Sequence, residues 1–217
     1  MARIIDLSLP LTDGGPSYPN DPPLRIQPYR TLATGGCNVS IISIGTHQGT
    51  HLDAPWHFIE GGRALDQIPL DAFYGPAVLA DLAPGGELPP KTAISPEMLS
   101  RHESAFVPGG RVILRTGWYS RFGRPEYFTD LPSLTADAAR WIADKQIVLL
   151  GMDMPTPSKI AGRECHHILL GPDAEIVIVE ALTNLHELPH AFTFIGFPLH
   201  FVGLDGSPIR AVAVVPD

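Results

Sequence analysis

The densest group of metal-binding side-chain types in this chain lies in the stretch Thr46-His47-Gln48-Gly49-Thr50-His51-Leu52-Asp53-Ala54-Pro55-Trp56-His57-Phe58. Three of the nine histidines and one aspartate, namely His47, His51, Asp53 and His57, fall within eleven residues of this stretch. Imidazole nitrogen and carboxylate oxygen are ligands that suit Zn²⁺ and Mn²⁺. Burying Asp53 among imidazoles without a cation would be costly. The stretch therefore predicts a bound divalent metal and marks where the chemistry of the protein is expected.

The stretch comes directly after an expected strand at residues 38–45, and its glycine and proline residues favour a loop that turns several side chains toward one point. The spacing of His47 and His51 is similar to that of zinc-binding helices. The HEXXH motif, however, needs glutamate at its second position, and here His47 is followed by Gln48 and Gly49. Because glycine also disfavours a regular helix, the sequence argues against a zinc metalloprotease.

The rest of the chain predicts a sheet-dominated core. Apolar runs rich in Val, Ile and Phe and bounded by Gly or Pro predict eight short strands, at Arg3–Leu9, Asn38–Gly45, Ala77–Leu82, Arg111–Thr116, Ile147–Met152, Ile176–Val179, Phe192–Phe197 and Ile209–Val215. Helices are expected after Ser95-Pro96-Glu97, at Ala136–Asp144 behind a Thr135 cap, and at His166–Leu170. Since helices separate only some of the strands, we expect an α/β fold with a mixed, partly parallel sheet. With 217 residues and 44% hydrophobic side chains, one domain over residues 1–217 is expected.

Charge and composition exclude several classes of partner. The formal net charge is −8 and no Lys/Arg run is present, so the electrostatic term that drives nucleic-acid binding is missing. An export signal is not expected, because Arg3 and Asp6 interrupt the first apolar residues. No stretch is apolar enough for a membrane span. Cys37 and Cys165 lie too far apart in sequence to suggest a disulfide framework, which favours a reducing compartment and hence the cytoplasm.

Some residues outside the stretch are candidates for the walls of a binding site. The aromatic segment Gly117–Leu134 is expected to be a loop that forms a pocket wall or a lid, and Tyr18 and Trp56 are candidate substrate-binding aromatics. Asp153 follows an expected strand, where it either orients the site or forms a turn. Direct binding to the metal is not expected for His102, His186, His190, His200 or Cys165.

The whole chain resembles the cyclase family, which includes bacterial kynurenine formamidases and isatin hydrolases. His47 to Phe58 matches the family signature HxGTHxDxPxHF almost completely. The opening Ile5-Asp6-Leu7-Ser8-Leu9-Pro10-Leu11, the segment Tyr18–Pro22 and the late segment Pro198–Ala211 are also similar to family landmarks. One departure is visible: Tyr18-Pro19-Asn20-Asp21 stands where the formamidases have Trp-Pro-Gly-Asp.

The resemblance implies a set of roles and a fold. In the family, the positions that match His47, His51 and Asp53 bind the metal, and the position that matches His57 is the general acid/base. A later histidine and glutamate complete the metal site; they match Glu180 and either His166, our first choice, or its neighbour His167. The resemblance also implies the family's swivelling β/β/α architecture, one or two ions of Zn²⁺ or Mn²⁺, and a homodimer.

The activity implied is hydrolysis of a carbon–nitrogen bond in a small aromatic amide, formamide or cyclic amide, with water activated by the metal and a proton moved by His57. The alternatives are kynurenine formamidase activity proper and a non-catalytic protein of the same fold that binds a metal or a small molecule. His57 separates the last two classes, because a metal store has no use for an acid/base outside the coordination shell.

Overall fold

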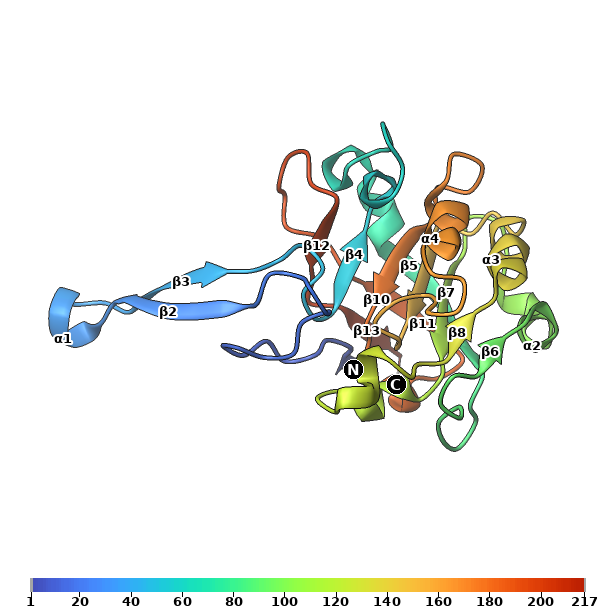
Figure 1. The fold of residues 1–217 in the computed structure, drawn as a ribbon, viewed down its shortest axis with the longest axis horizontal. Coiled ribbons are helices and arrows are strands. Elements are labelled where there is room, and N and C mark those ends of the chain that lie inside the picture. The colour runs from blue at the N-terminus through green and yellow to red at the C-terminus, as the bar shows by residue number, and fades with distance from the viewer. Residues whose placement is uncertain (1, 217) are drawn as a thin grey trace.

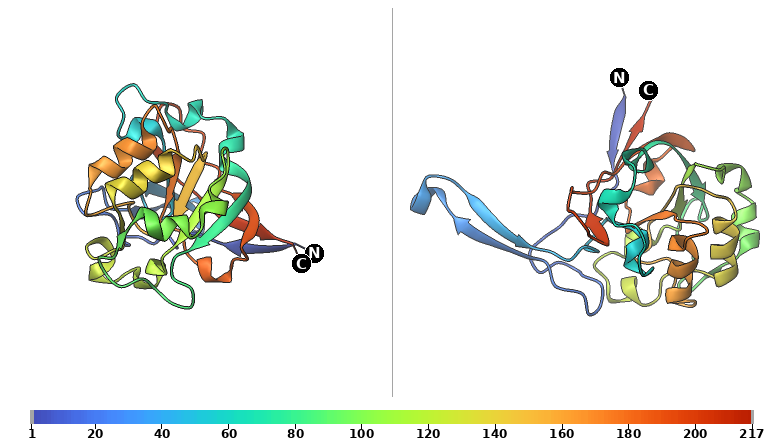
Figure 2. Two further views of the ribbon diagram at one scale, coloured as in Figure 1. Left: turned by 90° about the vertical axis from the view of Figure 1, so that its right-hand side faces the viewer. Right: turned by 90° about the horizontal axis from the view of Figure 1, so that it is seen from above.

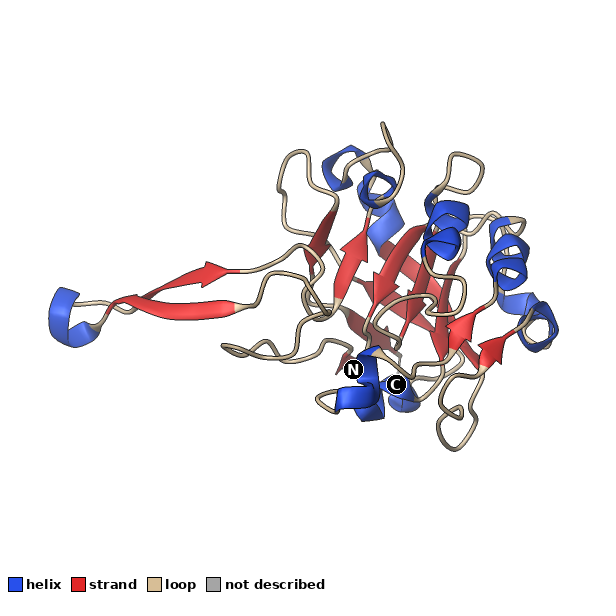
Figure 3. Ribbon diagram, in the orientation of Figure 1, coloured by secondary structure: helices blue, strands red, loops and turns tan. Residues whose placement is uncertain are grey.

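The computed structural model describes residues 2–216 and is built on one nine-stranded mixed sheet (Figures 1 and 3). The strands lie in the order β1 (Arg3–Asp6), β13 (Val212–Val215), β11 (Ala191–Ile195), β5 (Tyr74–Asp81), β7 (Arg111–Arg115), β9 (Leu149–Met152), β10 (Val177–Glu180), β4 (His51–Asp53) and β12 (Gly206–Pro208). The four central strands, β5, β7, β9 and β10, are parallel to one another, and the remaining pairings of the sheet are antiparallel. The predicted α/β class with a mixed, partly parallel sheet is confirmed.

The parallel centre of the sheet is buried on both faces, which explains its continuous apolar runs. In β7, for example, Val112, Ile113 and Leu114 are all fully buried. The crossovers between successive parallel strands carry α2 (Pro96–Ser100), α3 (Ala136–Ala143) and α4 (Arg163–Leu170), which cover one face of the sheet (Figure 2). The hydrophobic core is therefore split into two layers, one between the sheet and these helices and one on the opposite face.

Short elements complete the main body. Seven 3-10 helices lie in the described chain: η1 (Pro55–His57), η2 (Leu65–Gln67), η3 (Leu70–Phe73), η4 (Glu103–Ala105), η5 (Trp118–Arg121), η6 (Pro125–Phe128) and η7 (Leu185–Glu187). A small parallel pair is formed by β6 (Ala93–Ile94) and β8 (Ser133–Leu134). None of the helices in residues 2–216 is long and apolar enough to cross a membrane.

An antiparallel hairpin projects away from the main body (Figures 1 and 2). It consists of β2 (Arg25–Arg30), the short helix α1 (Leu32–Gly35) and β3 (Val39–Ser43), and we call residues 25–43 the arm. The prediction of a strand at Asn38–Gly45 is correct for β3, but its expected place in the core is wrong, because every residue of β3 is exposed. The large apolar side chains of the arm, Tyr29, Leu32, Val39, Ile41 and Ile42, are exposed.

Most predicted elements are present with shorter bounds. The helix behind Thr135 is α3, where the Thr135 hydroxyl caps the backbone N–H of Ala138 at 3.1 Å. The segment Gly117–Leu134 is wrong as a simple loop: it holds η5, η6 and β8, and Trp118 and Tyr127 are buried in the core. The strands β4 and β12 were not predicted, and they form the edge of the sheet that carries the histidine-rich stretch.

Candidate metal centre

His51 and Asp53 lie on a strand and not, as the sequence suggested, in a loop after a strand. Successive side chains of a strand point to opposite faces, so His51 and Asp53 share one face while Leu52 enters the core on the other. The antiparallel register sets Glu180 of β10 directly opposite His51. The sheet therefore places two carboxylates and one imidazole side by side on the face that α4 covers.

His166 reaches this face from α4. Its Nε2 lies 3.4 Å from Glu180 Oε1 and 3.9 Å from Asp53 Oδ2, and the residue is 7% exposed. His167, the alternative considered from the sequence, is exposed, and its Nδ1 donates to the backbone carbonyl of Arg163 at 2.8 Å. The helix thus brings His166, and not His167, to the cluster.

Asp205 joins the remaining two histidines of the stretch to the cluster. His47 donates from Nδ1 to Asp53 and from Nε2 to Asp205, each at 2.8 Å. The rings of His47 and His57 stack with centroids 3.8 Å apart, and His57 Nδ1 lies 3.3 Å from Asp205 Oδ2. Hydrogen bonds from His47 and His57 hold the pKa of Asp205 well below its usual range. Sequence reasoning did not identify Asp205 as a site residue, although it lies in the late segment that is similar to the family.

The titration of the histidines reflects the carboxylates around them. Burial favours the neutral ring of His47, but the charge of Asp53 and the hydrogen bonds that His47 donates to Asp205 and Asp53 outweigh it and raise its pKa to about 9. Burial likewise opposes protonation of His51, yet Asp53 and Glu180 raise its pKa well above the usual value. The carboxylates of this cluster therefore stabilise positive charge on the neighbouring imidazole rings. Bound protons provide that charge here, and a metal cation would provide it as well.

The donors fit a divalent metal ion. Asp53 is 1% exposed, and its Oδ2 has no hydrogen-bond partner among the described residues. A buried carboxylate oxygen without a partner is costly, and a cation would satisfy it. Three overlapping groups each have one ligand atom per residue within 4.8 Å of the others: His47, His51 and Asp53; Asp53, His57 and His166; and His47, His57 and Asp205. Nitrogen and carboxylate oxygen in this mixture are ligands for Zn²⁺ or Mn²⁺.

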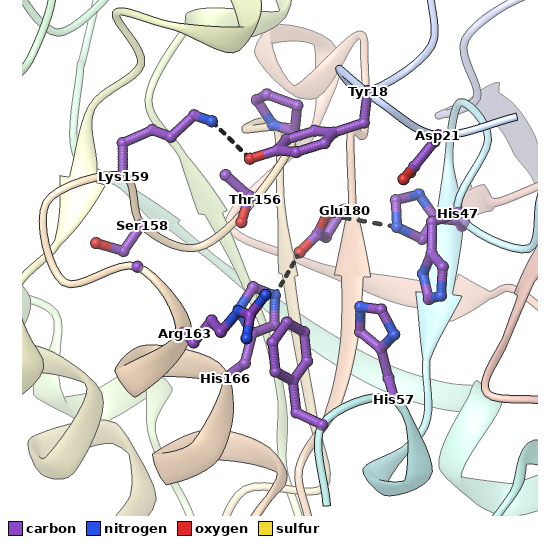
Figure 4. Close-up of a pocket in the computed structure, with 14 residues that line it drawn as sticks. Tyr18, Asp21, His47, His57, Thr156, Ser158, Lys159, Arg163, His166 and Glu180 are labelled. Carbon is purple, nitrogen blue, oxygen red and sulfur yellow. Dashed lines mark hydrogen bonds and ion pairs between the residues drawn. The ribbon is translucent and has the colours of Figure 1, made fainter. Parts of the chain in front are cut away.

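A cavity of ≈ 430 Å³ opens beside the cluster (Figure 4). Its walls combine imidazole, carboxylate, aromatic and cationic side chains: Tyr18, Asp21, His47, His51, His57, Phe58, Pro155, Thr156, Ser158, Lys159, Gly162, Arg163, His166 and Glu180. The candidate Tyr18 thus lines the cavity. The other candidate aromatic, Trp56, does not line it in this chain and is 45% exposed.

Part of the aromatic segment also borders the site. Phe122, Tyr127 and Phe128 line a smaller cavity of ≈ 20 Å³, which His47, His51 and Tyr18 also border. The Tyr127 hydroxyl is buried and has no hydrogen-bond partner among the residues of known placement. The segment therefore contributes a wall to the small cavity, as expected from the sequence. Trp118 does not take part in it and packs in the core.

Asp153 neither hydrogen-bonds to the histidine cluster nor caps a turn, which were the two roles expected from the sequence; it links two strands. Its carboxylate accepts hydrogen bonds from the Thr116 hydroxyl at 2.6 Å, from the Thr116 backbone at 3.0 Å and from the Gly117 backbone at 2.7 Å. Burial raises its pKa to about 6 in spite of these donors. Asp153 thus ties the end of β9 to the end of β7, and it makes no hydrogen bond to the histidine cluster.

Comparison with known proteins gives one family over most of the chain. The family model described as "Putative cyclase" matches residues 5–159. A kynurenine formamidase from Bordetella petrii is 31% identical over 98% of both chains, and one from Bacillus cereus is 31% identical over 96% of this chain and 95% of its own. Isatin hydrolase A from Labrenzia aggregata, solved with benzyl benzoate, has a TM-score of 0.87 at 27% identity and covers 100% of this chain and 94% of its own. A structure described as a potential metal-dependent hydrolase with cyclase activity has a TM-score of 0.80 at 27% identity and covers 100% of both chains.

Proposed function

This chain belongs to the cyclase family, and we propose that it is a metal-dependent hydrolase of the carbon–nitrogen bond in a small aromatic amide, formamide or cyclic amide. The observation that carries the proposal is the buried group of imidazoles and carboxylates that borders a cavity of ≈ 430 Å³. A cavity of this size takes a small ligand. The kynurenine formamidases and isatin hydrolases among its relatives support this substrate class.

The proposed metal ligands are His47, His51, Asp53, His166 and Glu180. We propose Zn²⁺ or Mn²⁺, with one or two ions, because the carboxylates of Asp53 and Glu180 each lie within 4 Å of both His51 and His166. A divalent ion held by such ligands lowers the pKa of water and polarises a substrate carbonyl. An imidazole that binds an ion releases a proton from the binding nitrogen, so loading should release protons from this cluster.

His57 is the proposed general acid/base. It lines the cavity, a quarter of its side chain is exposed, and Asp205 lies within reach of Nδ1. When Nδ1–H donates to Asp205, Nε2 is left to accept or deliver a proton at the reacting bond. His57 would then protonate the leaving nitrogen as the carbon–nitrogen bond breaks. Catalysis is favoured over simple metal storage because this histidine faces the cavity.

Two aromatic side chains supply the apolar walls that a planar substrate needs. Tyr18 lies against Phe128 with ring centroids 5.7 Å apart, and Phe58 stacks on His166 at 4.2 Å. Kynurenine formamidase activity proper is a second candidate, which the 31% identical relatives favour. Tyr18, in place of the tryptophan of the formamidases, is the reason to test N-formylkynurenine beside simpler substrates.

The test is steady-state kinetics on protein with a known metal content. Formanilide, N-formylkynurenine, isatin and an aliphatic formamide should be compared before and after exhaustive chelation, together with the melting temperature. We expect aromatic substrates to be hydrolysed, and chelation to abolish the activity and lower the melting temperature. Unchanged activity in protein shown to lack metal would refute the proposed function. An aliphatic substrate preferred about tenfold over every aromatic one, about 1.4 kcal/mol, would refute only the aromatic pocket.

Metal stoichiometry tests the number of ions. We expect close to two ions per chain in metal excess, falling toward one in Glu180→Ala, because the variant removes the carboxylate that His51 and His166 both face. A maximum of one ion per chain in the unmodified protein would establish a mononuclear site.

We also propose that residues 1–217 form one domain and that two copies assemble through the arm. The arm exposes Tyr29, Leu32, Val39, Ile41 and Ile42 by 43–67%. Several large exposed apolar side chains on one projecting element favour an interaction site there. A cytoplasmic location is proposed because neither cysteine is in a disulfide and the Cys37 thiol is exposed, which suits a reducing compartment.

A further inference from the structure

Gln48 is a buried polar residue of the histidine-rich stretch that the proposed reaction does not use. It holds the second position of the signature HxGTHxDxPxHF, where the signature specifies no residue, and it is 4% exposed. Its Oε1 accepts a hydrogen bond from the Ser17 hydroxyl at 2.7 Å, and its Nε2 donates to the Pro16 carbonyl at 2.7 Å. Both ends of the amide therefore bind one segment, which lies 31 and 32 positions earlier in the chain.

That segment delivers Tyr18 to the cavity. Tyr18 follows Ser17 directly and lines the cavity of ≈ 430 Å³, whereas Gln48 lines neither this cavity nor the smaller one. The Tyr18 hydroxyl accepts a hydrogen bond from Lys159 Nζ at 2.6 Å, and the Lys159 ammonium lies 4.6 Å from the centre of the ring. Figure 4 shows this pair on one side of the pocket, with His57 on the other. The aromatic ring is thus held at its hydroxyl end by Lys159 and at its backbone end through Gln48.

The backbone around Tyr18 has little regular structure to support it. Residues 9–24 lie in no helix or strand, and the backbone N–H of Asp21 donates to the Tyr18 carbonyl at 3.0 Å, inside the same segment. An aromatic wall that is already ordered binds a planar ligand more tightly than one that must first be ordered, because binding then costs less conformational entropy. The two hydrogen bonds of Gln48 provide that order by joining the segment to the stretch that carries the histidines.

We infer that Gln48 is a positioning residue, which fixes Tyr18 as an aromatic wall of the cavity and so strengthens binding of the aromatic part of the substrate. The inference rests on the proposed function, in which Tyr18 faces a planar substrate. The amide of Gln48 bonds to Ser17 and Pro16 and not to the histidine cluster. Its loss should therefore raise KM for aromatic substrates, while kcat and the metal content stay close to those of the unmodified protein.

The test compares Gln48→Met, Tyr18→Ala and the double variant as metal-loaded proteins. Methionine keeps the length of the side chain but removes the amide. We expect Gln48→Met to raise KM for formanilide by about fivefold or more, as for the loss of about one hydrogen bond, with kcat changed by less than about twofold. KM for N-ethylformamide should change by less than about twofold, because an aliphatic substrate gains little from the ring. Gln27→Met, at an exposed position of β2 outside both cavities, is the matched control and should leave both KM values unchanged.

The double variant shows whether Gln48 acts through Tyr18. In Tyr18→Ala the ring is absent, so the addition of Gln48→Met should raise KM for formanilide by less than about twofold. Calorimetric binding of oxindole, a planar lactam, gives the same comparison without turnover. A loss of oxindole binding in Gln48→Met that disappears in the Tyr18→Ala background supports the positioning role even if no amide is cleaved; in that case only the proposed reaction fails. Ser17→Ala removes one of the two hydrogen bonds from a partly exposed position and should weaken oxindole binding in the same direction, which provides a second variant if Gln48→Met does not fold.

Four results would overturn the positioning role while the hydrolase proposal stands. Unchanged oxindole binding in metal-loaded Gln48→Met, or in Ser17→Ala, would mean that Tyr18 needs no support from Gln48. An equal loss of binding in the Tyr18→Ala background would mean that Gln48 acts on another part of the cavity. Loss of metal from Gln48→Met would assign Gln48 to the support of its neighbour His47 instead.

Discussion

Asp205 accepts hydrogen bonds from two histidines for which we propose different roles. His47 is a proposed metal ligand and His57 the proposed acid/base, and one carboxylate oxygen lies 2.8 Å from the first and 3.3 Å from the second. A carboxylate behind an imidazole fixes the orientation and protonation of the ring. Asp205 is therefore expected to set both metal affinity and proton transfer, whereas each histidine affects one of them.

The two histidine roles can be separated by substitution. His57→Ala should lose on the order of 10²-fold or more in kcat and keep its metal, because the residue moves a proton without being a proposed ligand. His51→Ala should lose metal, since its Nε2 lies between Asp53 and Glu180. The measurement is metal content per chain beside kcat for formanilide. Equal loss of metal in both variants would make His57 a ligand.

Strand β12 restricts His47 through a glycine. A Cβ atom added at Gly206 would lie 2.6 Å from His47 Cε1 and 2.9 Å from the Leu52 carbonyl oxygen, closer than such contacts allow. We expect Gly206→Ala to push the imidazole out of position and to lower metal affinity by roughly tenfold or more, as for other changes beside a ligand. Gly86→Ala is the matched control, because a Cβ there meets nothing within 4 Å and the backbone φ is not positive. Equal metal affinity in the two variants would contradict the role of the close approach.

The link between β9 and β7 predicts a dependence of stability on pH. Burial raises the pKa of Asp153 from 3.8 to about 6, so between these values the folded protein keeps a proton that the unfolded chain has lost. This contribution to the free energy of unfolding is complete below pH 3.8 and is lost as the pH rises through 6. Its full size is about 3 kcal/mol.

Asp153→Asn removes the titrating carboxyl of Asp153 and leaves every other ionisable group of the protein in place. The free energy of unfolding of the unmodified protein minus that of the variant should therefore fall between pH 4 and pH 7, by up to about 3 kcal/mol. Urea unfolding at fixed metal loading measures it. A difference that rises with pH would mean that the donors of Thr116 and Gly117 outweigh burial.

Local patterns predicted the elements that are long and apolar. The runs that became β7, β9 and β10 are buried on both faces, so their composition alone identifies them. Strands β4 and β12 have three residues each, and His51-Leu52-Asp53 and Gly206-Ser207-Pro208 lack the strand composition. They form because β10 and β4 offer unpaired edges, which is a property of the assembled sheet.

Among the site residues, those in the family signature were predictable and those recruited by tertiary structure were not. His166 could be preferred to His167 only once the helix showed which ring faces Glu180. Asp205 lies in an Asp-Gly pair that is typical of turns, so its own sequence neighbourhood gives no chemical signal. The aromatic nature of Trp56 suggested a pocket, but its place in η1 turns it to the exterior of this chain.

The arm is expected to depend on a second copy of the chain for its stability. A two-stranded hairpin is marginally stable by itself, and this one has exposed apolar side chains. Ile41 and Ile42 point to opposite faces of β3, so Ile41→Glu and Ile42→Glu report on the two faces separately.

We expect at least one of these variants to convert a dimer to a monomer in sedimentation or light-scattering measurements, because burial of a glutamate without a partner is costly. Val107→Glu is the control, since Val107 is 51% exposed like Ile41 but lies on the main body. A monomeric unmodified protein, or a dimer that resists both substitutions, would contradict assembly through the arm.

The pairing of β4 with β10 also determines when the nascent chain can complete the cluster during synthesis. His51 and its partner Glu180 are 129 positions apart (180 − 51), so at 5–20 residues per second a ribosome makes them roughly 6–26 s apart. During that interval the emerging polypeptide carries His47, His51 and Asp53 but has no β10 to lie against and no helix to deliver His166. An ion that meets the chain at this stage would find only three of the five proposed ligands. Metal acquisition is therefore expected to come late in translation or after release from the ribosome, when the last fifth of the polypeptide closes the edge of the sheet.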